Sequence, residues 1–422
     1  MAIGLTVVTA NTKYWRGTGV LMKFRNLINL MSFSLSVILL HFASPSLYAQ
    51  TSTDQPSDTN QSWSTTTESQ TADANPTRIR ESHKQSGNRT VDSQHVERRG
   101  PDGRYERYFD IEKETVQVSP TTTKTITRSF GRDADGQKLL TQVTEEERQS
   151  LPGGSEKVVR VTSNADLDGR LQIVQREVAD TKKISPDVQE TKTTVFSSDG
   201  SGGLAPSMQV KERQKTGSDH TVNIQKSTLL LDGAGNWQVN EVKESTVKEN
   251  GDERTVDERV SKLDPDGKLA VVSSTQAKES QASAGEKKST IETYSTDAPG
   301  STRDGKLHLS QRVTTVNRSG SGGGKQTEQK VEQINPGDPN AGLHVSIQTL
   351  DNAQPGPSGT RETRTIQVRD AAGGFVVVSV DTTKSDKSHS VTVDISPQDK
   401  PPQDKPAQEK PTQDKPSQDK PQ

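Results

Sequence analysis

An acidic loop ending in glycine recurs along the chain and is its clearest candidate for chemistry. It reads DADG, DLDG and DPDG at residues 133–136, 166–169 and 264–267. Asp-x-Asp-Gly can begin a calcium loop, which needs oxygen ligands at positions 1, 3 and 5, glycine at 6 and glutamate at 12. Counted from Asp166, Asp168 falls at position 3 and Glu177 at 12, but Gly169 falls at 4 and Arg170 at 5.

The same residues suit a hairpin turn, and we favour that interpretation. Glycine accepts a positive φ angle, and an aspartate side chain can hydrogen-bond to the backbone of its own turn. Other copies place Ala-Gly at 341–342 and Gly-Ala-Gly at 233–235 in the same position. A turn permits this variation and a ligand set does not, so we predict no metal site.

Other constellations of catalytic residues are missing from the sequence. The chain has no cysteine, which excludes disulfides, thiol nucleophiles and thiolate ligands. The seven histidines show no metal-ligand spacing, and His308 and His344 occupy matching places in two repeats. The run SGSGGGKQ at 319–326 resembles a phosphate loop, but Gln326 stands where serine or threonine is required. We therefore predict no catalytic, cofactor-binding or metal-binding residues, no cofactor and no enzymatic activity.

Composition indicates a thin core. Hydrophobic residues make up 27% and aromatic residues 4% of the 422 residues, against about 45–50% apolar residues in globular domains. The 54 basic and 56 acidic residues are interleaved, with a net charge of −2. No basic face is evident, so nucleic acid is excluded as an expected partner.

The N-terminal region resembles a secretory signal peptide. Lys23 and Arg25 precede a mostly apolar run at 27–43, and a small-residue cleavage position follows at Ala49. Met22 is the expected true start. The run is shorter than the roughly 20 residues that span a bilayer, so we expect cleavage, although retention as an anchor stays open.

From residue 99 onward, glycines recur at a nearly fixed interval. Successive steps are 33, 33, 34, 32, 32, 38, 37 and 32 residues between Gly103, Gly136, Gly169, Gly203, Gly235, Gly267, Gly305, Gly342 and Gly374. A fixed period of this kind is typical of a repeat architecture. Apolar residues alternate with polar ones after each glycine, and a second turn signal follows midway. Each unit is therefore expected to contain two strands with one covered face.

These patterns predict an all-β fold, an elongated antiparallel β-meander of about nine two-strand repeats of about 33 residues, thin or single-layered. A small β-propeller or a sandwich is the alternative. An outer-membrane barrel is not expected, because it needs an outward apolar band with aromatic girdles. The expected organisation is a signal region, a disordered Ser/Thr/Gln-rich linker, the β-repeat domain and a disordered Pro-x-Gln-Asp-Lys tail of polyproline II character, at 1–49, 50–98, 99–396 and 397–422.

We predict an exported, non-enzymatic repeat protein, secreted or held in the periplasm or cell envelope, that acts as a structural or adhesive scaffold. The alternative is a carbohydrate-binding module or a hydrolase on a β-propeller. The partner is unknown, with cell-surface polysaccharide or another protein as candidates. After cleavage of the signal, no stable membrane insertion is expected.

Overall fold

The computed structural model describes residues 61–71, 74–133, 135–299, 305–320, 323–335, 338–356, 359–370 and 372–386. Twenty strands make up nearly all of these residues. They are β1 (Gln61–Thr71), β2 (Ala74–Ser86), β3 (Arg89–Arg99), β4 (Tyr105–Ser119), β5 (Thr122–Arg132), β6 (Lys138–Leu151), β7 (Ser155–Ala165), β8 (Leu171–Ser185), β9 (Val188–Ser198), β10 (Leu204–Thr216), β11 (Val222–Leu231), β12 (Trp237–Asn250), β13 (Glu253–Leu263), β14 (Leu269–Ser283), β15 (Glu286–Ser295), β16 (His308–Ser319), β17 (Lys325–Asn335), β18 (Asp338–Gly356), β19 (Gly359–Arg369) and β20 (Phe375–Asp386), with a short 3₁₀ turn, η1 (Pro152–Gly154), between β6 and β7.

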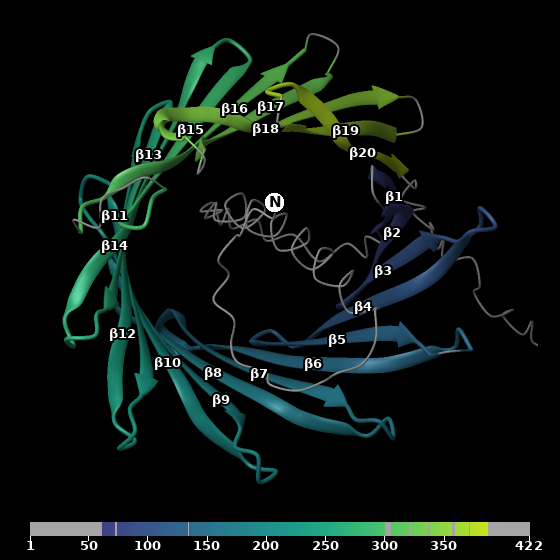
Figure 1. The fold of residues 1–422 in the computed structure, drawn as a ribbon. Coiled ribbons are helices and arrows are strands. Elements are labelled where there is room, and N and C mark those ends of the chain that lie inside the picture. Colours follow the sequence, from purple (N-terminus) through teal and green to yellow (C-terminus); the bar gives the residue numbers. More distant parts are fainter. Residues whose placement is uncertain are drawn as a thin grey trace, which may run out of the picture. The chain divides into compact units, whose positions relative to one another are not determined.

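The strands close into a barrel. Each strand pairs antiparallel with the next along the chain. The ring closes where β20 pairs with β1, from Ser64 opposite Asp386 to Thr71 opposite Ser379. Figure 1 shows the resulting ring of strands, with β1 beside β20. The expectation of antiparallel all-β structure is confirmed. The open meander, the small propeller and the sandwich are wrong.

Closure follows from the number of strands. An open, twisted sheet rarely exceeds about ten strands without curling, and an open edge leaves a row of unpaired N–H and C=O groups. Pairing of β1 with β20 removes both edges at once. A missing apolar band bears on insertion in a membrane, whereas closure satisfies the backbone groups of the edge strands with or without a membrane.

A bulge repeats in every second strand and helps the sheet to curve. In the register with the preceding strand, a bulge residue without a partner occurs in each even-numbered strand from β4 to β20: Tyr108, Thr141, Val174, Ser207, Asn240, Val272, Ser310, Ser346 and Val378. Bulges bend a strand and increase its twist. At Thr141, Ser207, Ser310 and Ser346 the side-chain hydroxyl donates to a carbonyl of the neighbouring strand, at 2.9–3.3 Å.

The register divides the wall into two faces that differ in exposure. On β13, Val256, Glu258 and Val260 are half-buried, whereas the alternate residues Asp257 and Arg259 are exposed. On β14, Gln276 opposite Asp257 is exposed, whereas Thr275 and Ala277, opposite Glu258 and Val256, are half-buried. Side chains converge on the concave side of a closed sheet and diverge on the convex side. The Val256 set therefore forms the inner face, and the Arg259 set forms the outer face.

The expected disordered linker at 50–98 is wrong for residues 61–71 and 74–98, which form β1, β2 and most of β3. These strands contain few apolar residues, but their threonines, serines and arginines pair across strands in the barrel. The signal region at 1–49, residues 50–60 of the linker and the 397–422 tail lie outside the described residues. Within the described part of the chain, no helix is long and apolar enough to cross a membrane.

Candidate functional site

The acidic loops are hairpin turns with one shared hydrogen-bond pattern. In the β7–β8 turn the Asp166 N–H donates to the Arg170 carbonyl at 2.9 Å, and the Gly169 N–H donates to the Asp166 carbonyl at 3.0 Å. Asp166 Oδ1 accepts the N–H groups of Asp168 and Arg170 at 2.9 and 2.8 Å. This carboxylate oxygen is therefore occupied by backbone donors, and the turn interpretation is confirmed here.

The same pattern recurs at Asp133, Asp199, Asp232 and Asp370. Hydrogen bonds from the backbone and side chain of its turn lower the pKa of Asp232, and those of Ser201 do the same for Asp199. In two turns the glycine with positive φ precedes the expected one, as Gly202 and Gly373.

The other sequence candidates are not brought together. His308 begins β16 and His344 lies in β18, on separate hairpins. The glycine run ending at Lys325 connects β16 to β17, two strands, rather than a strand to a helix. In the described ranges, no group of three or more His, Cys, Asp or Glu side chains is placed to hold a metal ion.

An apolar belt lies on the outer face near the Asp-Gly turns. Its members occupy outer register positions on successive hairpins: Phe130, Leu140, Leu171, Ile173, Phe196, Leu229, Trp237, Val239, Leu269, Val271, Tyr294, Leu309, Phe375 and Val377. Leu229 is 6% exposed, whereas Ile173 is 54% exposed. The belt is only a few residues tall along each strand, so it is much shorter than the apolar band of about 25 Å on transmembrane barrels.

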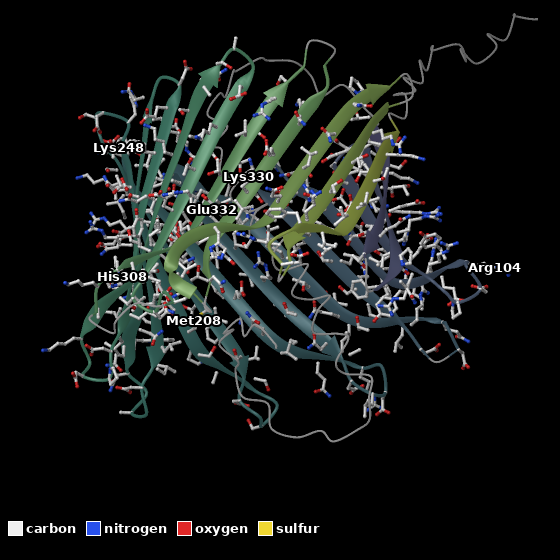
Figure 2. The ribbon with its side chains drawn as sticks, turned by 45° about the horizontal axis from the view of Figure 1, so that its top comes forward. Arg104, Met208, Lys248, His308, Lys330 and Glu332 are labelled. Carbon is white, nitrogen blue, oxygen red and sulfur yellow. The ribbon has the colours of Figure 1, made fainter. Side chains whose placement is uncertain are left out.

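Beyond the belt, the outer face carries ion pairs that run across strands. Arg312 on β16 lies between Glu292 on β15, at 2.8 Å, and Glu332 on β17, at 3.8 Å. The Tyr294 hydroxyl donates to Glu292 and, together with Arg312, lowers the pKa of that carboxyl. Figure 2 shows Lys330 and Glu332 among side chains that end in nitrogen and oxygen over the height of the wall.

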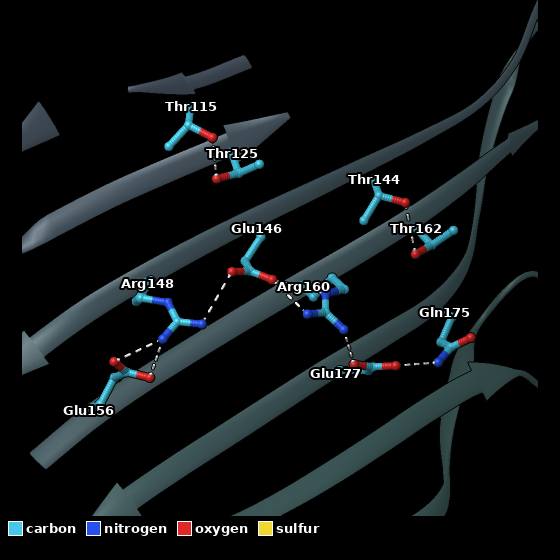
Figure 3. A network of polar contacts seen from close by, with 10 residues as sticks. All are labelled: Thr115, Thr125, Thr144, Glu146, Arg148, Glu156, Arg160, Thr162, Gln175 and Glu177. Atoms are coloured by element: carbon cyan, nitrogen blue, oxygen red, sulfur yellow. Dashed lines mark hydrogen bonds and ion pairs between the residues drawn. The ribbon is translucent and has the colours of Figure 1, made fainter. Parts of the chain in front are cut away.

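The inner face carries a polar network of its own (Figure 3). Arg160 on β7 donates to Glu146 on β6 at 2.7 Å and to Glu177 on β8 at 3.0 Å. Both carboxylates raise the pKa of Arg160, with the Glu146 hydrogen bond as the largest cause. Nearby, Thr144 and Thr162 bond through their hydroxyls at 3.4 Å.

One buried charge cluster was missed by sequence reasoning. Asp110 on β4 is 0% exposed, accepts a hydrogen bond from His95 Nδ1 on β3 at 2.7 Å and pairs with Arg132 on β5. These residues lie 15 and 22 positions from Asp110 in the chain. Only the cross-strand register brings them together, and no local pattern signals it.

Comparison with known proteins gives a structural likeness only. No family model and no curated protein matches the chain. The siderophore receptor PirA from Pseudomonas aeruginosa has a TM-score of 0.43 at 10% identity, covering 79% of this chain and 81% of that one. The copper transporter OprC has a TM-score of 0.41 at 7% identity, with coverages of 80% and 81%.

Salmonella typhi OmpF, solved with daunomycin, has a TM-score of 0.31 at 7% identity, covering 78% of this chain and 98% of that one. Scores of this size add nothing to the closed antiparallel barrel that the strand pairings establish directly. What these proteins bind or transport is a property of those proteins.

Proposed function

We propose that the chain is exported to the bacterial envelope or exterior and acts there as a non-enzymatic, structural or adhesive barrel. The observation that carries this proposal is the charged outer face. At mid-strand it presents Lys192, Lys211, Arg259, Lys278, Arg312 and Lys330. A basic residue on the lipid face of a barrel costs about 2–4 kcal/mol at the bilayer midplane, so this set strongly opposes insertion.

A channel in the outer membrane is the second candidate, because the wall is closed and both its ends are rimmed by turns. The outer charges count against it, and so does the short apolar belt. In the scaffold that we favour, water contacts both faces of the wall. Such a surface supports many weak contacts with a polymer or with a neighbouring protein.

Fractionation tests this assignment. The full chain would be expressed in a bacterial host with an outer membrane, and the exported fraction would be washed with alkaline carbonate and, separately, with detergent. We expect release without detergent, because the outer face is hydrated. Recovery only in detergent, together with stepwise conductance in planar bilayers, would reject the scaffold hypothesis in favour of a membrane channel.

A further inference from the structure

Two open grooves on the outer face share one composition. The first, of about 350 Å³, is lined by Arg259, Val271, Ser274, Gln276, Tyr294 and Leu307. The second, of about 420 Å³, is lined by Asn352, Gln354, Arg361 and Thr363. Each therefore combines one guanidinium with an amide and a hydroxyl side chain. The first also offers a tyrosine ring and two aliphatic side chains.

Among the residues that the structure describes, the arginine in each groove has no carboxylate partner, a feature that it shares with Arg107, Arg176 and Arg369 on the same face. Outer-face arginines such as Arg132, Arg213, Arg312 and Arg318 each pair with a carboxylate. Within the described residues, Arg259 and Arg361 have no carboxylate partner. For Arg259 this is so although Glu244 lies opposite it in the register of β12 and β13.

The register leaves Arg361 in a cationic neighbourhood. It lies opposite Gln354 on β18 and opposite Lys384 on β20. Neither neighbour can neutralise a guanidinium. Both grooves thus keep five N–H donors in a planar fork available for an external anion, and a carboxylate fits that fork with two parallel hydrogen bonds.

We propose that these grooves bind a carboxylate-bearing polysaccharide, a chain of uronic acid units, laid along the outer wall. The arginine takes the sugar carboxylate. Asn352, Gln354 and Thr363 in one groove, and Ser274 and Gln276 in the other, exchange hydrogen bonds with ring hydroxyls. The Tyr294 ring, beside Val271 and Leu307, covers the apolar C–H face of a sugar.

Groove shape favours a polymer over a small molecule. Sites for small ligands are enclosed and mostly apolar, whereas these grooves are shallow and open along the wall. Two sites on one wall also let a single chain bind twice, which strengthens weak contacts. An acidic peptide would also satisfy the arginines, and its backbone could bond to the amide and hydroxyl groups. The Tyr294 ring beside Val271 and Leu307 favours the apolar C–H face of a sugar instead.

This inference rests on the proposed scaffold function, since the outer face must be in water. Calorimetry would measure binding of oligogalacturonate to the full chain at physiological salt, with the fully methyl-esterified oligomer as the matched neutral ligand. We expect binding of the acid and at least tenfold weaker binding of the ester. R259Q and R361Q should each weaken binding of the acid about fivefold to tenfold, and Y294L should weaken it severalfold.

R213Q is the matched control, because it removes one outer-face positive charge that Glu190 already pairs. It should change binding less than twofold. Circular dichroism would confirm that every variant retains its strands. Equal binding of acid and ester, an equal loss in R213Q, or equal binding of polyglutamate would each overturn the proposal.

The two proposals fail separately. A protein released without detergent that does not distinguish acid from ester keeps the scaffold function and rejects the uronate site. A protein inserted in the membrane rejects the scaffold, and lipid would then cover the outer wall, which also rejects the site.

Discussion

The inner and outer faces of the wall use similar residues in different arrangements. On the inner face, hydroxyls meet across strands, as in Thr115–Thr125, Thr144–Thr162 and Thr181–Thr191. The outer face combines an apolar belt, ion pairs that cross strands, and several arginines that have no carboxylate partner in the described part of the chain, of which Arg259 and Arg361 line grooves. The inner pairs satisfy one another and hold the wall together. The outer face keeps hydrogen-bonding capacity for something outside the protein.

The largest expected effect on stability comes from a truncation that opens the barrel, because only a closed wall has an inner and an outer face. A chain ending at Ser261 would lose part of β13 and all strands after it, including the partner of β1. Its exposed edges and uncovered concave face should prevent cooperative folding. Circular dichroism and limited proteolysis would compare residues 61–261 with residues 61–386. A fragment that keeps its strand signal and resists digestion as well as the longer chain would contradict the closed barrel and support an open meander.

A second prediction uses two adjacent leucines that lie on opposite faces. Leu229 belongs to the outer belt and is 6% exposed, whereas Leu230 lies on the inner face and is 40% exposed. L229A should lower the free energy of unfolding by about 2–3 kcal/mol, through lost burial and a residual cavity. L230A should lower it by less than about 1 kcal/mol, because water already reaches that side chain.

Urea denaturation of the two variants, with unchanged slopes, would provide this measurement. Equal losses would mean that the two leucines are buried alike, against exposures of 6% and 40%.

The strands and turns could be predicted from sequence because their signals are local. Alternation with a period of two marks a strand, and Asp-x-x-Gly supplies both the carboxylate and the positive φ that the turn uses. Closure was not predictable in this way, since it depends on pairing between residues 64–71 and 379–386, which lie far apart in the sequence. The low apolar content of β1 to β3 predicts disorder, but hydrogen-bonded closure lets these strands form with little burial.

The bulges hide from the sequence which residues share a face of the sheet. Ile173 and Arg176 lie on the same outer face although their positions differ by an odd number, because the unpaired Val174 shifts the alternation. A reader of the sequence who counts by twos therefore misplaces every residue after the bulge. The first groove spans the bulge at Val272, which puts Val271 and Ser274 on one face. The Asp110 cluster and the second groove depend on cross-strand pairing, which no local sequence pattern reveals.

A third prediction concerns the outer ion pairs and acid. The pKa of Glu292 is lowered, first by the Tyr294 hydroxyl and then by Arg312. Because the folded pKa lies below the unfolded one, its contribution is fully present above the unfolded value near 4.5 and is lost as pH falls through the folded pKa. E292Q should therefore flatten the acid side of a plot of melting temperature against pH.

Y294F should produce part of the same flattening, because it removes the hydroxyl donor and keeps the carboxylate. An E292Q profile parallel to that of the unmodified protein down to pH 2 would show that this outer pair contributes nothing to stability.

The smallest expected effect is that of calcium on the turns, which belong to neither face. If Asp166 Oδ1 is engaged by the N–H groups of Asp168 and Arg170, a cation would have to displace two hydrogen bonds to reach it. Millimolar calcium should then leave the melting temperature of the full chain unchanged within about 1 °C, a shift that corresponds to only a few tenths of a kcal/mol. Magnesium at equal ionic strength is the control for screening. A rise seen with calcium and not with magnesium, and abolished when Asp133, Asp135, Asp166, Asp168, Asp264 and Asp266 are changed to Asn, would make these turns metal sites. The rim of the barrel would then be a regulated surface as well as a structural one.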